Sequence, residues 1–235
     1  MLSPAERKRN NFARSLLPGY GAEHTKYEQL YQLYSKSGYT KELCESYVDL
    51  FINDTKKPAA EDIVTVAELY DGIHDLKTAK FYLDMLEDRK LSGIEKYNYC
   101  IESLKVKSKL GQWRDAVDFR TENINFLQNF SQKRNPQEQA DMFIALSLTD
   151  CASKHYPEAF KLLRFGYKPH GRNDETLLEI FITGVYIFAK SGDTAGVEEA
   201  VANSHACLKL FKEFKFSWIK NYYEKRIAEA AEGIL

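Results

Sequence analysis

Apolar residues recur along this chain at the spacing of an amphipathic helix. In five segments they follow positions i, i+3, i+4 and i+7, which lie on one face of an α-helix. These sets begin at Tyr27, Ile63, Cys100, Phe143 and Phe181. The sets at Cys100 and Phe143 include polar residues, whereas the other three are apolar or small throughout. The pattern predicts five helices that each turn one face toward a core.

A short segment and a second apolar pattern follow each of these helices. The segments begin at Gly38, His74, Gly111, Lys154 and Gly192, which lie 36, 37, 43 and 38 residues apart. Such a period is typical of stacked helical hairpins. Glycine suits a tight turn because the left-handed conformation is cheap for it. His74 and Lys154 lack this advantage, so we expect those two turns to differ from the rest.

Small or apolar residues recur five places after each turn begins. They are Leu43, Ala79, Ala116, Ala159 and Val197. Trp113 lies three places before Ala116, and Leu76 and Tyr156 hold the same place in two other copies. We interpret Trp113 as a large side chain that wedges two helices together rather than as a ligand-binding group, because aromatic residues at helical spacing mostly build cores.

The segment IVTVAELYDGIHDLKTAKFYLDML, residues 63–86, resembles the tetratricopeptide repeat family. The matching positions are Ile63, Val66, Ala67, Tyr70 and Ala79. The resemblance implies an all-α fold, a right-handed α-solenoid of about five helix-turn-helix repeats with capping helices at both ends. The repeat units are expected near 24–59, 60–96, 97–139, 140–177 and 178–207. The extra length near 129–140 predicts a longer loop or an extended second helix.

The two ends of the chain are expected to cap the repeats. Residues 1–23 predict a basic amphipathic helix and a linker, with a nucleic-acid contact as the alternative. Residues 208–235 predict a C-terminal capping helix, since a solenoid needs its last open face covered. Its stretch LKLFKEFKFSWIKNYYEKR combines six cations with six aromatic residues. A homodimer contact or an acidic partner is the alternative use of this helix.

The resemblance also implies where a partner would bind, because the first helices of such hairpins line the concave side. Transferred position by position, the candidate residues are Glu28, Gln32, Glu61, Val64, Glu68, Asn98, Ile101, Lys105, Asp141, Ile144, Leu148, Glu179, Ile182 and Tyr186. The first half of this predicted groove is acidic and polar, and the second half is apolar. It would suit a peptide with a basic or polar end and an apolar end. Glu28 and Gln32 replace the Lys and Asn with which one family subtype holds acidic peptide tails, so we expect no such binding there.

Composition and motifs narrow the function further. The chain is 44% apolar and 29% charged with a net charge of −1, which predicts a packed core and no general attraction to nucleic acid. It has no signal-peptide pattern, and its longest apolar stretch, Ile180–Ala189, is too short to cross a bilayer. Four widely spaced cysteines, with no CxxC pair, fit a cytoplasmic protein. Nucleophile, phosphate-loop and metal motifs are all missing, so we expect no cofactor, no metal site and no catalytic residues.

The sequence therefore favours a non-enzymatic scaffold that binds a protein or peptide. An RNA-binding helical repeat is the first alternative, although an RNA groove should be basic. A helical enzyme is the second, and a deep pocket ringed by acids would favour it.

Overall fold

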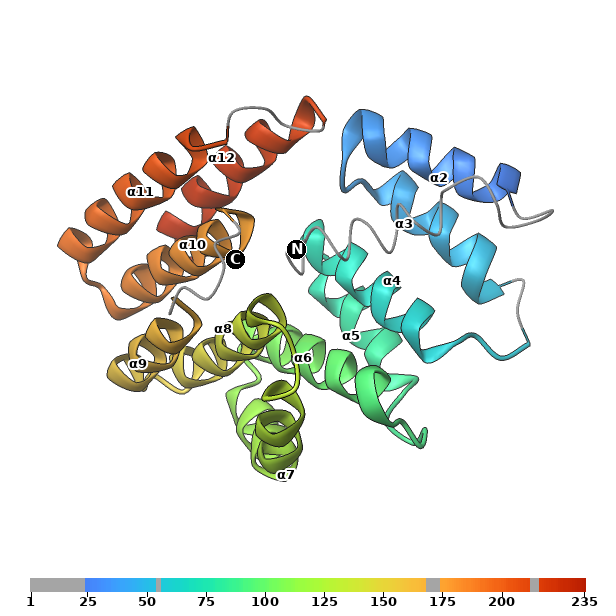
Figure 1. Cartoon of the computed structure of the whole chain (residues 1–235), viewed down its shortest axis with the longest axis horizontal. Coiled ribbons are helices and arrows are strands. Elements are labelled where there is room, and N and C mark those ends of the chain that lie inside the picture. The colour runs from blue at the N-terminus through green and yellow to red at the C-terminus, as the bar shows by residue number, and fades with distance from the viewer. Residues whose placement is uncertain (1–23, 54–55, 168–173, 212–215) are drawn as a thin grey trace.

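The computed structural model describes residues 24–53, 56–167, 174–211 and 216–235, and these are helical with no strands. The helices in Figure 1 are α2 (His24–Ser37), α3 (Lys41–Val48), α4 (Ala60–Gly72), α5 (Leu76–Asp84), α6 (Gly93–Lys109), α7 (Trp113–Ser131), α8 (Pro136–Ala152), α9 (Tyr156–Tyr167), α10 (Asp174–Ser191), α11 (Thr194–Lys209) and α12 (Trp218–Ala231). A π-helical turn, Asp49–Asn53, continues α3. The all-helical prediction is confirmed, while the predicted N-terminal cap, 1–23, lies outside the described residues.

Consecutive helices pair into five hairpins, from α2–α3 to α10–α11, and their turns begin where the sequence pattern placed them. From the second hairpin on, the first helices pack in series, α4 on α6, α6 on α8 and α8 on α10, and the last helix, α12, packs on α10. Figure 1 shows this succession curving around a centre until α12 comes back beside α2 and α3. Phe216 and Trp218 pack against both halves of the hydrophobic core, because they lie where the two ends of the ring meet.

All five hairpin turns contain one residue with a left-handed φ, so the expectation that the turns at His74 and Lys154 would differ is wrong. The residue φ angles are 70° at Gly38, 61° at His74, 72° at Gly111, 62° at Lys154 and 78° at Gly192. The last four turns also share a backbone hydrogen bond that closes the helix end, such as the bond from the Asp75 N–H to the Tyr70 carbonyl oxygen at 2.9 Å and from the His155 N–H to the Asp150 carbonyl oxygen at 2.9 Å. These bonds satisfy helix-end carbonyl groups and offset the strain of a side chain at a left-handed position.

This strain gives a testable prediction at Lys154, which is exposed. Lys154→Gly should stabilise the protein by about 0.5–1 kcal/mol, since relief of a left-handed residue outweighs the added freedom of the unfolded chain. Urea unfolding measures the change. Gly192→Ala is the matched control: no atom lies within 4 Å of the added Cβ, so only the backbone penalty acts and stability should fall. A Lys154→Gly protein that is less stable than the wild type would contradict the prediction.

Trp113 does not wedge its hairpin. Its side chain is 45% exposed at the first position of α7 and stacks with the guanidinium of Arg114, 5.1 Å from the ring. The close contact between the helices falls instead on Ala116, which is fully buried. Leu43, Ala79 and Ala159 are fully buried at the same place in other hairpins. In the three hairpins with Ala79, Ala116 or Ala159 at this place, the small buried residue lets the two helices approach closely.

The extra length of the third unit extends its second helix. α7 runs over 19 residues, and only residues 132–135 separate it from α8. Asn135 then starts α8 by accepting hydrogen bonds from the backbone N–H groups of Gln137 and Glu138, with Pro136 in the first turn. The alternative of a longer loop is therefore wrong.

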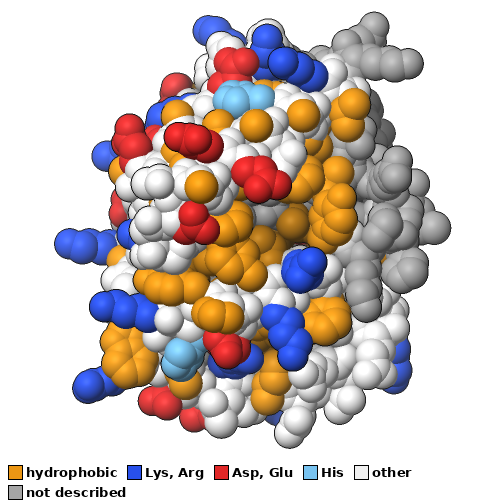
Figure 2. Space-filling view, turned by 90° about the vertical axis from the view of Figure 1, so that its left-hand side faces the viewer, with side chains coloured by type: hydrophobic (Ala, Val, Ile, Leu, Met, Phe, Trp, Pro, Cys, Tyr) orange, Lys and Arg blue, Asp and Glu red, His pale blue; other side chains and the backbone are white. Residues whose placement is uncertain are grey.

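The outer surface of the ring is formed by the second helices. On the side where α9 and α11 lie, hydrophobic side chains gather in a shallow hollow, with charged side chains around it (Figure 2). The second helices pack inward on the first ones, as where Phe160 of α9 meets Phe188 of α10 with ring centroids 4.2 Å apart. The polar side chains that converge inside the molecule come from the first helices instead.

Candidate functional site

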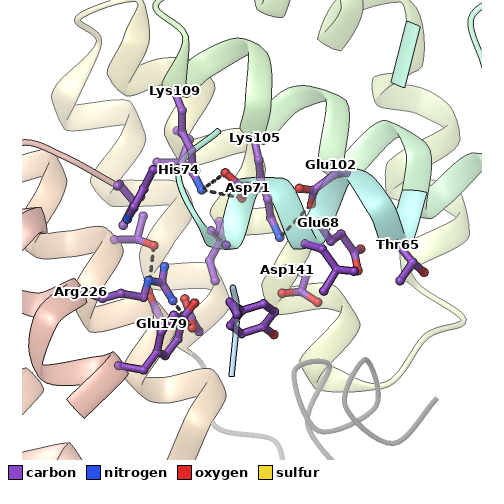
Figure 3. Close-up of a pocket in the computed structure, with 18 of the residues that line it drawn as sticks. Thr65, Glu68, Asp71, His74, Glu102, Lys105, Lys109, Asp141, Glu179 and Arg226 are labelled. Carbon is purple, nitrogen blue, oxygen red and sulfur yellow. Dashed lines mark hydrogen bonds and ion pairs between the residues drawn. The ribbon is translucent and has the colours of Figure 1, made fainter. Parts of the chain in front are cut away.

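A cavity of about 160 Å³ lies at the centre of the ring. Its wall is built by the inner helices α2, α4, α6, α8, α10 and α12 and by the turns after α2 and α4, so each hairpin contributes to it. Its labelled polar residues in Figure 3 are Thr65, Glu68, Asp71, His74, Glu102, Lys105, Lys109, Asp141, Glu179 and Arg226. Several of these residues are three or four positions apart on one helix, such as Glu68 and Asp71 on α4, and such residues share a helix face. That shared face is the one that lines the cavity.

Lys109 and Asp71 form an ion pair that joins α6 to α4 across the cavity wall. The Lys109 Nζ lies 2.7 Å from Oδ2 and 2.9 Å from Oδ1 of Asp71. The two side chains are only 9% and 13% exposed. A buried carboxylate of this kind must keep its cation, because an isolated buried charge is costly.

Arg226 and Glu179 form the equivalent pair between α12 and α10. The guanidinium donates from Nη1 to Oε1 of Glu179 and also lies over the ring of Tyr222, 5.6 Å from its centroid. This pair fixes the last helix to the fifth hairpin at the edge of the cavity (Figure 3).

The charges around the cavity act on one another. Burial by itself would raise the pKa of Asp71, but Lys109, with Lys105 and Arg226 beyond it, holds that pKa below its ordinary value. Burial by itself would also raise the pKa of Glu179. The positive charge of Arg226, together with Lys105 and Lys109, lowers that pKa below its ordinary value. Both carboxyl groups are therefore ionised at neutral pH. The cations of α6 and α12 stabilise the charged forms of Asp71 on α4 and of Glu179 on α10.

Acidic groups outnumber basic ones in the cavity wall. Glu68, Asp141 and Glu102 add three carboxylates to Asp71 and Glu179, against the cations of Lys105, Lys109 and Arg226. The Nζ of Lys105 lies 3.9 Å from Oε2 of Glu102 on the same helix, α6. His74 also contacts a carboxylate, with Nε2 at 3.1 Å from Oε2 of Glu229 on α12. Among the described side chains of the wall, carboxylates therefore outnumber cations, a balance that favours a cationic group over an anionic one.

The structure brings together six of the fourteen residues predicted for the concave side. Those in the cavity wall are Glu68, Lys105, Asp141, Ile144, Leu148 and Glu179. Four others, Val64, Ile101, Ile182 and Tyr186, are core residues. In the apolar half of the predicted groove, Ile144 and Leu148 line the cavity, whereas Ile182 and Tyr186 are buried in the core. A partner-binding role for the fourteen residues stays a prediction.

The remaining predicted residues lie away from the cavity. Glu61 is exposed on α4, and Asn98 is half-buried on α6. Glu28 and Gln32 line a separate open groove between α2 and α3, together with Leu33 and other residues. Only part of each inner helix therefore faces the cavity.

Sequence reasoning missed several cavity residues, chiefly Asp71, Glu102, Lys109 and Arg226. The spacing from Glu68 to Asp71 and from Glu102 through Lys105 to Lys109 was a usable signal, because each set lies on one helix face. Arg226 had no such signal, since α12 reaches the cavity only by closing the ring. Within the described part of the chain, no group of three or more His, Cys, Asp or Glu side chains is placed to hold a metal ion.

The cysteines are poor candidates for chemistry. All four are buried as reduced thiols. Burial raises the pKa of Cys44 and of Cys100 to about 12 and that of Cys151 to about 11, which keeps these thiols protonated. Among the described helices, none is long and apolar enough to span a bilayer. The cytoplasmic location remains a prediction.

No family model, curated protein or solved structure matches the chain. The resemblance to tetratricopeptide repeats therefore remains a prediction from the residues of the hairpins, and the function must be argued from the cavity itself.

Proposed function

We propose that this chain is a non-enzymatic protein-binding module, a right-handed solenoid of tetratricopeptide-like hairpins curled into a ring, whose central cavity takes a cationic group of a partner peptide. The larger number of carboxylates than cations among the described side chains of the cavity wall supports this proposal. A lysine or arginine side chain, or the amino group at a peptide's N-terminus, has the matching charge. Only charge-assisted hydrogen bonds would offset its loss of hydration there.

The size of the cavity limits what enters it. A volume of about 160 Å³ suits one side chain rather than a length of peptide backbone. The rest of a peptide would lie over the rim, so the cavity selects one basic anchor residue. This arrangement resembles other interfaces in which one residue fills a buried pocket and supplies most of the binding energy.

The same charge balance disfavours the RNA alternative. Phosphate groups would meet five carboxylates, and the cations in the wall already pair with Asp71, Glu179 and Glu102. Single-stranded RNA should therefore bind weakly if at all.

The proposal is tested with a pool of fluorescent peptides that each carry one lysine or arginine, compared with norleucine and citrulline versions of the same peptides. We expect fluorescence anisotropy to show binding only of the peptides with the charged side chain.

The protein variants Glu68→Gln and Asp141→Asn should each weaken this binding about tenfold, equivalent to about 1.4 kcal/mol. Glu61→Gln is the matched control, because Glu61 is exposed on the same helix as Glu68 and lies outside the cavity. Equal binding of the neutral peptides, or no binding of any peptide, would overturn the proposal.

A helical enzyme is the second candidate, since carboxylates line the cavity from several helices. A general acid in such a site needs a raised pKa, whereas the pKa values of Asp71 and Glu179 are lowered. Those two carboxyl groups suit structural ion pairs. Hydrolysis of a panel of chromogenic esters and glycosides that Glu68→Gln and Asp141→Asn abolish would favour the enzyme.

A further inference from the structure

The ring is closed by a group of aromatic side chains between α12 and the first hairpin. We call Tyr34, Tyr39, Phe216, Trp218 and Tyr222 the aromatic seam. The ring centroids of Tyr34 and Trp218 are 5.2 Å apart, and those of Tyr39 and Tyr222 are 5.3 Å apart. His74 and Glu229 add one polar contact next to the seam, between the α4–α5 turn and α12.

The seam differs in how it is made from the joints between α4, α6, α8, α10 and α12. Each of those helices packs directly on the next one along the series. The last helix, α12, meets the first hairpin through long aromatic side chains, such as those of Tyr39 and Trp218, whose ring centroids are 6.0 Å apart. A joint made of side chains can separate without unfolding either of the elements that it connects.

One feature of Trp218 shows that the joint leaves a polar group unsatisfied. Its indole Nε1 is buried and has no hydrogen-bond partner among the described residues, although a buried Trp N–H usually finds one. A second feature shows that the joint depends on the absence of a side chain at Gly38, because a Cβ added there would come within 2.6 Å of two carbons of the Trp218 ring. Opening the joint would return the indole N–H to water.

The seam is also a wall of the central cavity. Tyr34, Tyr39 and Tyr222 line the cavity as well as forming the seam, and His74 and Arg226 line it beside them. Separation of α12 from the first hairpin would therefore expose the cavity along its side, while the packing of α4, α6, α8 and α10 on one another stays unchanged.

We propose that the aromatic seam is a gate, which opens to admit the partner's basic group to the cavity and closes behind it. This inference rests on the proposed function of the cavity. The opening itself needs no ligand, so it can be measured separately.

Cavity access is measured with Thr183→Cys, a near-isosteric probe that lines the cavity and is 2% exposed in the wild type. The rate of its reaction with a bulky fluorescent maleimide reports opening, and the protein without the probe gives the background from the four buried cysteines. Gly38→Asn, which pushes against Trp218, should raise this rate about tenfold or more. Gly111→Asn is the matched control: its φ is 72° against 70° at Gly38, but no atom lies within 4 Å of the added Cβ.

Urea unfolding of the same proteins separates opening from global unfolding. The gate predicts that the labelling rate rises in Gly38→Asn far more than the loss of global stability accounts for, and that it does not do so in Gly111→Asn. If Gly38→Asn fails to fold, Trp218→Leu tests the same joint with the same expected rise. Labelling that follows global stability alike in all variants would overturn the gate. Faster labelling of Gly38→Asn without binding of basic peptides would support the gate and overturn the proposed function. Binding of basic peptides without faster labelling would support the proposed function and overturn the gate.

Discussion

Replacement of Arg226 by methionine should destabilise the protein by about 3–5 kcal/mol, because Glu179 would keep its charge in a buried site without its cation. The side chains of Arg226 and Glu179 are 15% and 25% exposed, so water can only partly replace the lost partner. The loss is measured by urea unfolding at neutral pH. This pair also fixes α12 to α10, so both ends of the closing helix should exchange amide hydrogens faster.

The double variant Arg226→Met/Glu179→Leu is the informative control. Removing both charges takes away the uncompensated carboxylate, so we expect it to recover most of the stability that the single change loses. Lys225→Met controls for charge alone, since Lys225 pairs with Glu229 at the surface with 68% of its side chain exposed. Its effect should stay within about 1 kcal/mol. A loss below that size in Arg226→Met would mean that the pair is not an important contact.

Acid should destabilise the folded protein through the cavity carboxylates. The pKa values of Asp71 and Glu179 are lowered in the fold from ordinary values of 3.8 and 4.5. The unfolded chain therefore binds protons at a higher pH than the folded one. Their contribution to stability is fully present above those ordinary values and is lost as the pH falls through the lower folded values. We expect the free energy of unfolding to fall steadily below about pH 4.5.

Asp71→Asn isolates one of these groups. The variant should be less stable at neutral pH, because Lys109 loses its charged partner, and its stability should fall less steeply in acid. Urea unfolding across a pH series measures both effects. Glu61→Gln provides the control, since Glu61 is exposed and should leave the acid slope unchanged. Identical acid slopes for Asp71→Asn and the wild type would show that Asp71 is not one of the groups responsible.

The charged cavity and its closing joint give this protein two separable properties. Glu68 and Asp141 set which group the cavity favours, and Trp218 with Gly38 sets how the cavity is reached. Variants of the first pair should change affinity with little effect on access, and variants of the second should change access first. Measurement of both on the same proteins therefore distinguishes recognition from gating.

The sequence by itself determined the local structure, because helical periodicity and turn chemistry depend on residues close together in the chain. The apolar stripe from Ile63 to Tyr70 predicted α4, and the repeat spacing predicted where the five turns begin. The same spacing picked out Ala79, Ala116 and Ala159, which are fully buried in the structure. The conformation at His74 and Lys154 was not, since backbone hydrogen bonds at the helix ends outweigh the preference for glycine there.

Only the tertiary structure decided how the hairpins meet. The curvature of the ring decides whether Trp113 is exposed and whether Val64 and Ile101 face a groove or the core. It also brings Arg226 of α12 to Glu179 of α10. That curvature sums small rotations between successive hairpins, and no local pattern encodes the sum. The closing contact between Gly38 and Trp218 joins residues 180 positions apart, so its partners could be known only once the ring was seen to close.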